Sequence, residues 1–375
     1  MKVPFFDWSK LYLEDREQYL KIIDQTLSMG RLVLQTDVDD FETSLKALIN
    51  VKHAIALADG TNAILLGLRA SGIGQGDEVI LPSHAFIAAA QSIRHAGAIP
   101  VVVDIDPIDW MLSPSSIEKY VTERTKAIMP VHVNGRMCNM EEIMLLAEKY
   151  GLKVFEDAAQ ALGAKFDGVP AGHFGEWATF SFYPSKTLGS FGDAGALVTQ
   201  STEIAKKVVS MRNHGADETK TIANNIDLWG TNCRLDNLQA AILNYKLTKY
   251  DDAIRRRRAI ALCYQNAFST IPQLNLPPKP SEEKVHFDIF QNYELRAQSR
   301  DELRKFLAAK GVGTIVQWGG LALHQLKNLG LAQTLPETDA FFDECLLLPM
   351  NHMLTNDDVD YVIENVTSFY RVKEA

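Results

Sequence analysis

Two strand-like stretches between residues 154 and 199 each end in a reactive side chain, and this arrangement constrains the fold more than any other feature. The first is a short apolar run, 152–155, that leads into Asp157. The second, 178–183, leads almost directly into Lys186. Ligands of open α/β sheets bind at the carboxyl ends of the strands. We therefore expect Asp157 and Lys186 to lie near each other at one edge of a sheet.

A lysine and an aspartate at one site are the pair that pyridoxal phosphate (PLP) requires. The lysine forms a Schiff base with the cofactor, and the carboxylate lies beside the pyridine nitrogen. Lys186 considered alone could also be a solvated surface lysine, which is the usual environment of this residue type. The motifs on either side of Lys186 favour the cofactor role.

Three sequence motifs resemble the DegT/DnrJ/EryC1/StrS family of sugar aminotransferases. They are EDAAQ at 156–160, SFYPSK at 181–186 and GDAGALVT at 192–199. The resemblance runs from about Gly30 to the C-terminus. It implies an α/β enzyme of PLP fold type I, with a large domain built on a mostly parallel seven-stranded sheet covered by helices, and a smaller C-terminal α+β domain. The sugar dehydratase branch of the family has His at the position of Lys186, so this lysine favours transamination.

The length of the chain suits two domains with substantial cores. It has 375 residues, of which 46% are hydrophobic, and chains beyond about 250–300 residues usually divide into domains. We place the large PLP-binding domain at 1–249 and the small C-terminal domain at 250–375. For the N-terminal residues, packing on the small domain is the alternative.

Charge and cysteine usage argue against several classes of protein. The formal charge of −9 disfavours general nucleic-acid binding. Cys138, Cys233, Cys263 and Cys345 are scattered without metal-ligand spacing, so no metal site is expected. Residues 1–18 lack the apolar centre of a signal peptide, and no apolar run is long enough to cross a membrane. We therefore expect a cytoplasmic protein with neither nucleic-acid nor membrane partners.

Strand-like and helical segments alternate up to about residue 250. Besides the two runs described above, strands are expected at 53–58, 78–81, 99–104 and 126–132. A helix at 140–150 begins with Asn139 and Glu142, which resemble a capping box, and ends at Gly151. This alternation predicts a largely parallel sheet with both faces covered.

From about Tyr250 the pattern changes to a smaller α+β unit. We expect helices at 252–268, 300–310 and 357–370, and a strand at 289–297. Ser299 and Glu302 form a capping box for the second of these helices, and Gly311 ends it. Four consecutive arginines, 255–258, are interpreted as a solvated, acid-flanked helix face.

A strand, a glycine turn and a helix start come together at Gly60, Thr61 and Asn62. Such a helix N-terminus binds anions because its N–H groups and its dipole point toward the ligand. The resemblance implies that these three residues hold the phosphate of PLP. The alternative for Thr61 is an ordinary helix N-cap.

The resemblance also implies roles for residues around the cofactor ring. Phe86 stacks on the pyridine, although the sequence equally allows a phenylalanine of the core. Gln160 approaches the ring hydroxyl, and Ser181 contacts the phosphate. Asp157 keeps the pyridine nitrogen protonated. Lys186 binds the cofactor covalently at rest, and after displacement it serves as the catalytic base.

Asn232 implies a second subunit. The segment GTNCRLDNLQAAIL at 230–243 is similar to a family segment whose asparagine reaches the PLP phosphate of the neighbouring subunit. The resemblance therefore implies a homodimer with shared active sites. From the sequence alone, Asn232 could also simply cap the helix that follows.

Candidates for substrate contact are spread along the chain: His132, Tyr183, Arg212, His214, Arg234, Trp318 and His324. For His132 the alternative is a structural histidine, and for Tyr183 it is ordinary strand packing. Segments 290–296 (FQNYELR) and 317–326 (QWGGLALHQL) depart from the usual family pattern. Because this region shapes the sugar pocket in the family, the identity of the substrate depends on it.

The function that follows is a PLP-dependent sugar transaminase. The expected reaction moves an amino group from an amino acid, L-glutamate being the expected donor, to a nucleotide-linked keto-sugar for polysaccharide or glycan synthesis. One alternative is a transaminase of a free keto-sugar or keto-cyclitol. Another is a non-catalytic PLP-binding regulator, which is disfavoured because the catalytic set is complete and no DNA-binding domain is attached. The sequence leaves open the nucleotide and the position of amination.

Overall fold

A seven-stranded sheet forms the centre of the computed structural model, which describes residues 2–216, 226–280 and 285–374. The strand order is β1-β9-β8-β5-β4-β2-β3. β9 is antiparallel to both of its neighbours, and the other strands are parallel to one another. The strands are β1 His53–Leu57, β2 Glu78–Pro82, β3 Ile99–Val103, β4 Thr125–Ile128, β5 Lys153–Asp157, β8 Trp177–Ser181 and β9 Gly195–Thr199. The prediction of a mostly parallel seven-stranded sheet is confirmed.

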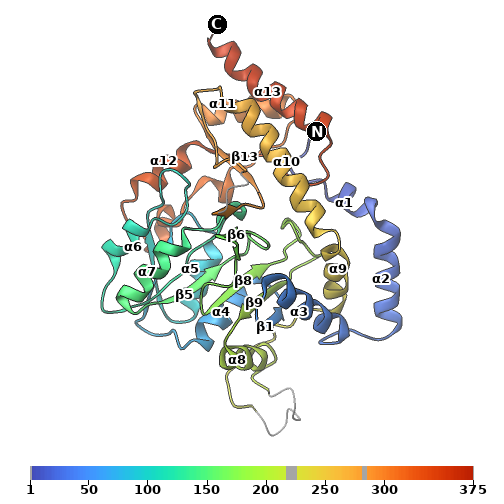
Figure 1. Cartoon of the computed structure of the whole chain (residues 1–375), viewed down its shortest axis with the longest axis vertical. Helices are drawn as coiled ribbons and strands as arrows, with labels where there is room; N and C mark the ends of the chain where they lie inside the picture. The colour runs from blue at the N-terminus through green and yellow to red at the C-terminus, as the bar shows by residue number, and fades with distance from the viewer. Residues whose placement is uncertain (1, 217–225, 281–284, 375) are drawn as a thin grey trace.

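Helices flank this sheet, as Figure 1 shows. α4 packs on β8 and β9, α8 packs on β1, and α7 packs on β5. Asn139 caps α7 by accepting the N–H of Glu142, as predicted. The helices that precede residue 250 are α1 Trp8–Glu14, α2 Arg16–Ser28, α3 Thr36–Ile49, α4 Gly60–Ala70, α5 Ile87–His95, α6 Pro114–Tyr120, η1 Val133–Gly135, α7 Met140–Tyr150, α8 Thr202–Arg212 and α9 Asn237–Leu247. All residues of β2 and β9 are buried, as strands covered on both faces require.

The C-terminal segments, orange to red in Figure 1, gather at one end of the molecule around a second core. Its sheet has the order β10-β12-β13 and is antiparallel. The elements of this part are α10 Tyr250–Phe268, β10 Leu274–Asn275, β12 Tyr293–Ala297, α11 Arg300–Ala309, η3 Gln317–Gly320, η4 Leu323–Gln325, η5 Lys327–Leu329, α12 Pro336–Glu344, β13 Cys345–Leu348 and α13 Asn356–Glu374. A third, small sheet joins β11 His286–Phe287, β6 Lys165–Phe166 and β7 Val169–Pro170.

The N-terminus is tied to this second core. Val3 is buried in it, its N–H donates to the carbonyl of Gly311, and its own carbonyl accepts from Gly313. The chain then passes through α1 and α2 at the side of the molecule and enters the large sheet (Figure 1). Residues 4–7 are thereby held between the two cores.

Three local predictions need correction. The strand expected at 126–132 spans only Thr125–Ile128, and beyond it the chain keeps a single isolated parallel bridge, from Val131 to Asp157, before the short helix η1 begins at Val133. The strand expected at 289–297 begins only at Tyr293, since Phe290 has φ 52° and interrupts the extended backbone. Ser299 precedes α11, but its side chain makes no capping bond because its backbone is left-handed, with φ 57°.

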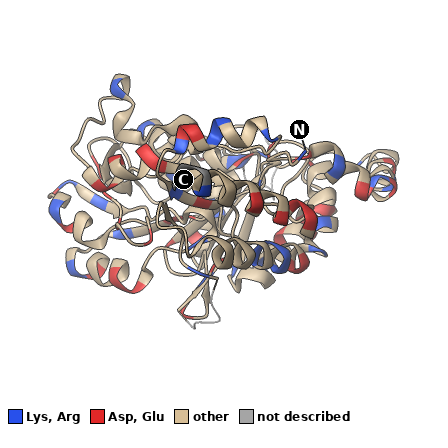
Figure 2. Cartoon of the chain, turned by 90° about the horizontal axis from the view of Figure 1, so that it is seen from above, with Lys and Arg blue, Asp and Glu red and all other residues tan. Residues whose placement is uncertain are grey.

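The four arginines of α10 are not a solvated face. Arg255 is exposed beside Asp252, but Arg257 is 3% exposed and its Nη1 donates to three main-chain carbonyls. Arg256 and Arg258 also donate to carbonyls, so the run ties α10 to loops of the C-terminal part. Figure 2 shows basic and acidic residues interspersed on the outer helices.

The part of the chain that the structure describes has neither a membrane-spanning helix nor a metal-binding cluster. No helix in the described ranges is long and apolar enough to span a membrane. Within the same ranges, no group of three or more His, Cys, Asp or Glu side chains is arranged to hold a metal ion.

Candidate active site

A cavity of about 570 Å³ lies where the strand ends of the large sheet face the C-terminal part. The large sheet contributes Asp157 at the end of β5 and Ser181 at the end of β8. The start of α4 contributes Gly60 and Thr61. From the C-terminal part come Gln291, Asn292, Gln317 and Trp318, and the N-terminal segment adds Phe5 and Phe6. Lys186 faces the same cavity, so the structure brings the predicted lysine and aspartate together.

Lys186 lies on a tight loop after β8. Its N–H donates to the carbonyl of Tyr183, and the loop then folds back so closely that a Cβ at Gly189 would lie 2.5 Å from the carbonyl oxygen of Pro184. Burial lowers the pKa of the Lys186 amine to about 8, and the nearby negative charge of Asp157 opposes this shift. Near neutral pH an appreciable fraction of the amine is therefore unprotonated and nucleophilic.

Gln291 holds both neighbours of Lys186 with one amide group. Its Oε1 accepts from the N–H and the hydroxyl of Thr187, both at 2.7 Å, and its Nε2 donates to the carbonyl of Ser185 at 2.9 Å. Gln291 is 4% exposed. The C-terminal part therefore fixes the loop that carries the reactive amine.

Asp157 is held in place by its backbone and by one side-chain bond. Its N–H donates to Pro130, its carbonyl accepts from His132, and its Oδ1 accepts the N–H of Ala159 at 3.1 Å. Burial raises the pKa of Asp157, and the positive charge of Lys186 is among the influences that lower it. A cation placed beside this buried carboxylate would be strongly stabilised.

The start of α4 forms the anion-binding end of the cavity. Asp59 caps the helix, since its Oδ1 accepts the N–H of Asn62 at 2.8 Å and its Oδ2 accepts the Asn62 amide at 2.7 Å. A Cβ at Gly60 would lie 3.1 Å from the Cβ of Ser181, so α4 and β8 approach closely. The Asn62 amide is bound to Asp59 and does not line the cavity, and the phosphate contact expected of it stays a prediction. Thr61 is not the N-cap, since Asp59 caps the helix.

These groups fit PLP. The first turn of α4 offers N–H groups to a phosphate, Lys186 offers an amine with a lowered pKa, and Asp157 offers a carboxylate to a protonated ring nitrogen. Phe86 is 52% exposed and lines the cavity, so it is not a core phenylalanine. Gln160 Oε1 accepts the N–H of Asn134 at 2.6 Å, which leaves its Nε2 as a donor for the cavity.

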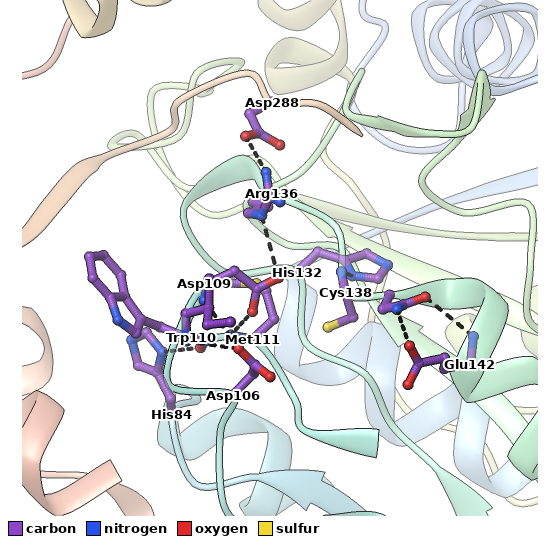
Figure 3. A network of polar contacts seen from close by, with 12 residues as sticks. His84, Asp106, Asp109, Trp110, Met111, His132, Arg136, Cys138, Glu142 and Asp288 are labelled. Atoms are coloured by element: carbon purple, nitrogen blue, oxygen red, sulfur yellow. Dashed lines mark hydrogen bonds and ion pairs between the residues drawn. The ribbon is translucent and has the colours of Figure 1, made fainter. Parts of the chain in front are cut away.

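His132 is a structural histidine. It is completely buried, and its Nε2 donates to Glu156 at 3.1 Å while its Nδ1 accepts the N–H of Cys138 at 3.2 Å. Both ring nitrogens are used, so this side chain has no hydrogen bond left for a substrate even though it borders the cavity. Of the two interpretations of His132 that the sequence left open, the hydrogen bonds favour the structural histidine. Figure 3 shows it beside Cys138, with Arg136 between Asp109 and Asp288 nearby.

Arg212 and His324 bind other groups of the protein, and the substrate contacts expected of them stay predictions. Arg212 is 5% exposed, and its Nη1 donates to Glu42 at 2.6 Å and to the carbonyl of Ala56 at 3.1 Å. His324 lies between Ser83 and Asp339, at 2.7 and 2.9 Å, and links the large sheet to α12. Neither residue lines the cavity.

The remaining candidates divide into two groups. Tyr183, which is 52% exposed, and Trp318 line the cavity as predicted for substrate contacts. Asn232 and His214 are exposed outside it, and Arg234 donates to Asn213 at 3.0 Å. Asn232 does not cap α9, because the residue that precedes this helix is Asp236.

Several residues of the cavity were not singled out from the sequence. Asn292 and Gln317 line the cavity and lie in the segments 290–296 and 317–326. The departure of these segments from the family pattern was the sequence feature that could have drawn attention to them. Phe5 and Phe6 carried no signal, because their contact depends on the packing of the N-terminus against the second core.

Comparison with known proteins decides the family. The model of the DegT/DnrJ/EryC1/StrS aminotransferase family matches residues 14–367. The chain belongs to this family. It is accordingly a PLP-dependent aminotransferase, and the resemblance seen in the sequence motifs is confirmed.

Similar proteins cover almost the whole chain. A "Pleiotropic regulatory protein" of Geobacillus stearothermophilus is 39% identical over 99% of both chains. The dTDP-3-amino-3,4,6-trideoxy-alpha-D-glucose transaminase of Streptomyces venezuelae is 36% identical over 97% of this chain and 95% of its own. A UDP-N-acetyl-3-dehydro-alpha-D-glucosamine 3-aminotransferase of Acidithiobacillus ferrooxidans is 36% identical over 95% of both. The solved structure of S. venezuelae DesV in complex with a ketimine intermediate has a TM-score of 0.93, 35% identity and 98% coverage of both chains.

The lowered pKa of Lys186 leads to a pH prediction. Covalent capture of added PLP by cofactor-free protein requires the neutral amine, so its rate should rise with pH and reach half of its maximum near pH 8. An unperturbed lysine would give a midpoint near 10.4. Absorbance after mixing at about pH 6 to 11.5, a range that includes both midpoints, measures the rate. The Lys186→Ala protein serves as the control, and a midpoint at the unperturbed value would contradict the prediction.

Proposed function

We propose that this aminotransferase transfers an amino group from an amino acid, with L-glutamate as the donor, to a nucleotide-linked keto-sugar, giving an amino-deoxy sugar for polysaccharide or glycan synthesis. The observation that carries the proposal is the convergence of Lys186, Asp157 and the start of α4 on one cavity. Relatives named for dTDP-sugar and UDP-sugar amination support the substrate class.

Different residues of the cavity have different roles in the proposed reaction. PLP, when bound, supplies a conjugated ring that accepts the electron pair left at the substrate carbon. The N–H groups of Gly60 and Thr61 would hold the phosphate, and Asp157 would stabilise the protonated ring nitrogen. Lys186 would hold the cofactor at rest, and its Nζ, when free, would serve as the base that takes a proton from the substrate carbon and as the acid that returns it. The Gln291 amide keeps this lysine in place.

The test separates the two half-reactions. Holoenzyme mixed with L-glutamate alone should lose its yellow colour and release 2-oxoglutarate. Subsequent addition of a keto-sugar from a panel of dTDP-linked and UDP-linked 3-keto- and 4-keto-hexoses should restore the colour and give an amino-sugar, detected by mass spectrometry. If only free keto-sugars or keto-cyclitols restore the colour, the result would favour the alternative function, a transaminase of a free keto-sugar or keto-cyclitol. If no common amino acid bleaches the protein, the transaminase function is wrong, and the regulator hypothesis gains support.

We further propose a homodimer in which Asn232 contacts the phosphate bound by the partner subunit. Asn232 is exposed and lies outside the cavity of its own chain. Trp229, on the same loop, is 96% exposed, and so large an exposed aromatic side chain suits an interface.

We also propose that residues 1–249 form the large domain and residues 250–375 the small domain. We propose in addition that the protein is cytoplasmic.

The Asn232→Ala variant tests the shared site. It should raise the dissociation constant for PLP about tenfold, because one neutral hydrogen bond to the phosphate contributes about 1–1.5 kcal/mol. Dialysis against buffer followed by absorbance measures retention, and light scattering should give a dimer or a larger assembly of dimers. Asn266→Ala, at an exposed position of α10 away from the cavity, is the matched control. A monomer that is active and retains PLP would refute the proposal.

A further inference from the structure

A chain of amide side chains links a buried carboxylate to the active-site cavity. Glu294 on β12 is 1% exposed, and its Oε2 accepts from Asn134 Nδ2 at 2.5 Å. The Oδ1 of Asn134 accepts from Asn292 Nδ2 at 2.8 Å. Asn292 Nδ2 also donates to Gln317 Oε1 at 3.3 Å. The chain therefore runs from Glu294 through two asparagines to Gln317, which lines the cavity.

The carboxylate at the start sets the direction of every bond in this chain. A glutamate carboxylate can only accept, so Asn134 turns its NH₂ toward Glu294 and its oxygen away. That oxygen requires a donor from Asn292, and the same NH₂ group also meets the oxygen of Gln317. The amide of Gln317 consequently turns its oxygen toward the chain, and its NH₂ lies on the other branch of the amide, away from Asn292.

The NH₂ group of Gln317 is the open end of the chain. The side chain is 3% exposed, and its Nε2 has no hydrogen-bond partner among the described residues. A buried donor without a partner is unfavourable, since the water that it lost has not been replaced. An oxygen atom of a ligand in the cavity would complete it.

The backbone next to Gln317 holds this donor rigidly. Trp318, Gly319 and Gly320 have φ values of 50°, 74° and 80°. A left-handed conformation is unusual for tryptophan and persists only where the surroundings impose it. Here the Trp318 ring lies 5.3 Å from His84 and 6.4 Å from Phe86, measured between ring centroids. The segment therefore lines the cavity with the Trp318 ring and places the unpaired Gln317 amide directly beside it in the chain.

We propose that Gln317 Nε2 donates a hydrogen bond to a neutral oxygen, a hydroxyl or carbonyl, of the keto-sugar acceptor, and that Gln317 is a specificity-determining residue for the sugar. A single neutral amide matches a neutral oxygen, whereas the carboxylate of an amino donor is held best by charged groups. A sugar ring also presents a C–H face that can pack on Trp318. The inference rests on the proposed function, because it assumes a sugar acceptor.

The experiment measures the two half-reactions separately in stopped flow, so that the amino donor serves as an internal control. L-Glutamate bleaches the holoenzyme, and the keto-hexose nucleotide that restores the wild-type colour fastest is then used as the second probe. Gln317→Met, which keeps the length of the side chain but removes the donor, should leave the rate with glutamate within about twofold of wild type. Its rate constant with the keto-sugar at low concentration should fall about 10- to 100-fold.

Two further variants check the reasons for this loss. Gln325→Met makes the same change in the same segment, but Gln325 bonds Ala322 and Asp339 and does not line the cavity, so both rates should stay near wild type. Glu294→Gln allows the amide chain to reverse, which would turn the Gln317 oxygen toward the cavity. It should slow the keto-sugar step and spare the glutamate step.

The outcomes are distinguishable. An unchanged keto-sugar step in Gln317→Met would overturn the proposal, and equal slowing of both steps would mean that the residue only maintains the site. A normal keto-sugar step in Glu294→Gln would show that the charge of Glu294 does not set the orientation of the chain. If the wild-type protein itself fails to respond to any amino donor, the proposed function fails, and this inference falls with it.

Discussion

Replacing Lys186 by alanine is expected to lower turnover about 10⁴-fold or more, because the substitution removes both the covalent attachment point and the group that moves the proton. The cofactor should still bind, since the start of α4, Ser181 and Asp157 do not depend on the lysine. Steady-state rates with glutamate and the keto-sugar measure the loss. Difference spectra after addition of PLP should show binding without covalent capture.

Lys165→Ala provides a matched control. Lys165 lies on β6, is exposed and does not line the cavity. Its removal should leave turnover within about twofold of wild type, as is usual for exposed positions away from a site. Borohydride reduction of the wild-type holoenzyme should fix the cofactor on the peptide that contains Lys186. Label on a peptide with Lys165 or Lys153 instead would show that the assignment of the nucleophile is mistaken.

The centre of the site could be predicted from the sequence because each element of it is local. Asp157 and Lys186 each end a strand-like run, and a doubly covered sheet brings such ends to one edge. The start of α4 could be recognised in the same way, from a strand followed by Gly60. Two β-strands and a helix start were enough to predict which residues meet at the cavity.

The roles of Arg212 and His324 could not be predicted, because their partners are distant in sequence. Glu42 lies on α3, 170 residues before Arg212, and accepts from its guanidinium. Ser83 lies 241 residues before His324. A polar residue in a family-like motif is easily taken for a substrate-binding residue when its hydrogen-bond partners lie far away in the sequence.

The wall that faces the substrate was unpredictable for a related reason. Asn292 and Gln317 reach the cavity only because the C-terminal part packs over the strand ends, and Phe5 only because the N-terminus is bound to Gly311. Periodicity reports the face that an element buries. It does not report which two cores will share a cavity between them.

Replacing Glu156 by alanine is expected to destabilise the fold by about 3–5 kcal/mol, the largest stability effect that we predict for one side chain. Glu156 is completely buried and accepts four hydrogen bonds. Three come from the N–H groups of Gly172, Phe174 and Gly175 at 2.9 Å, and one comes from His132 at 3.1 Å. Alanine would leave all four donors without a partner in the interior.

The neighbouring acid on the same strand should behave in the opposite way. Side chains alternate across a strand, so Glu156 and Asp157 point to opposite faces of β5, and only Asp157 faces the cavity. Asp157→Ala should therefore keep most of the stability and lose most of the activity. Two adjacent carboxylates thus serve separate purposes, one for the fold and one for the chemistry.

The pH dependence of stability gives an independent check on Glu156. Burial would raise the pKa of its carboxyl, but the bonds from His132 and from the main chain outweigh burial and lower it. A carboxyl whose pKa is lower in the folded state stabilises the protein above its unfolded pKa, about 4.3, and this contribution is lost as pH falls through the folded value. Wild-type stability should therefore decrease on acidification below that range, and Glu156→Ala should show a weaker decrease.

Denaturant unfolding followed by fluorescence measures both effects, with Glu176→Ala as the matched control. Glu176 is 37% exposed at its side chain and lies 3.4 Å from Lys153, a pair expected to contribute at most about 1 kcal/mol. Glu156→Gln should fall between the two, because its amide oxygen can still accept some of the four bonds. If Glu156→Ala unfolds at the same denaturant concentration as Glu176→Ala, the buried carboxylate does not hold the 172–175 turn against β5 in the way that its four bonds indicate.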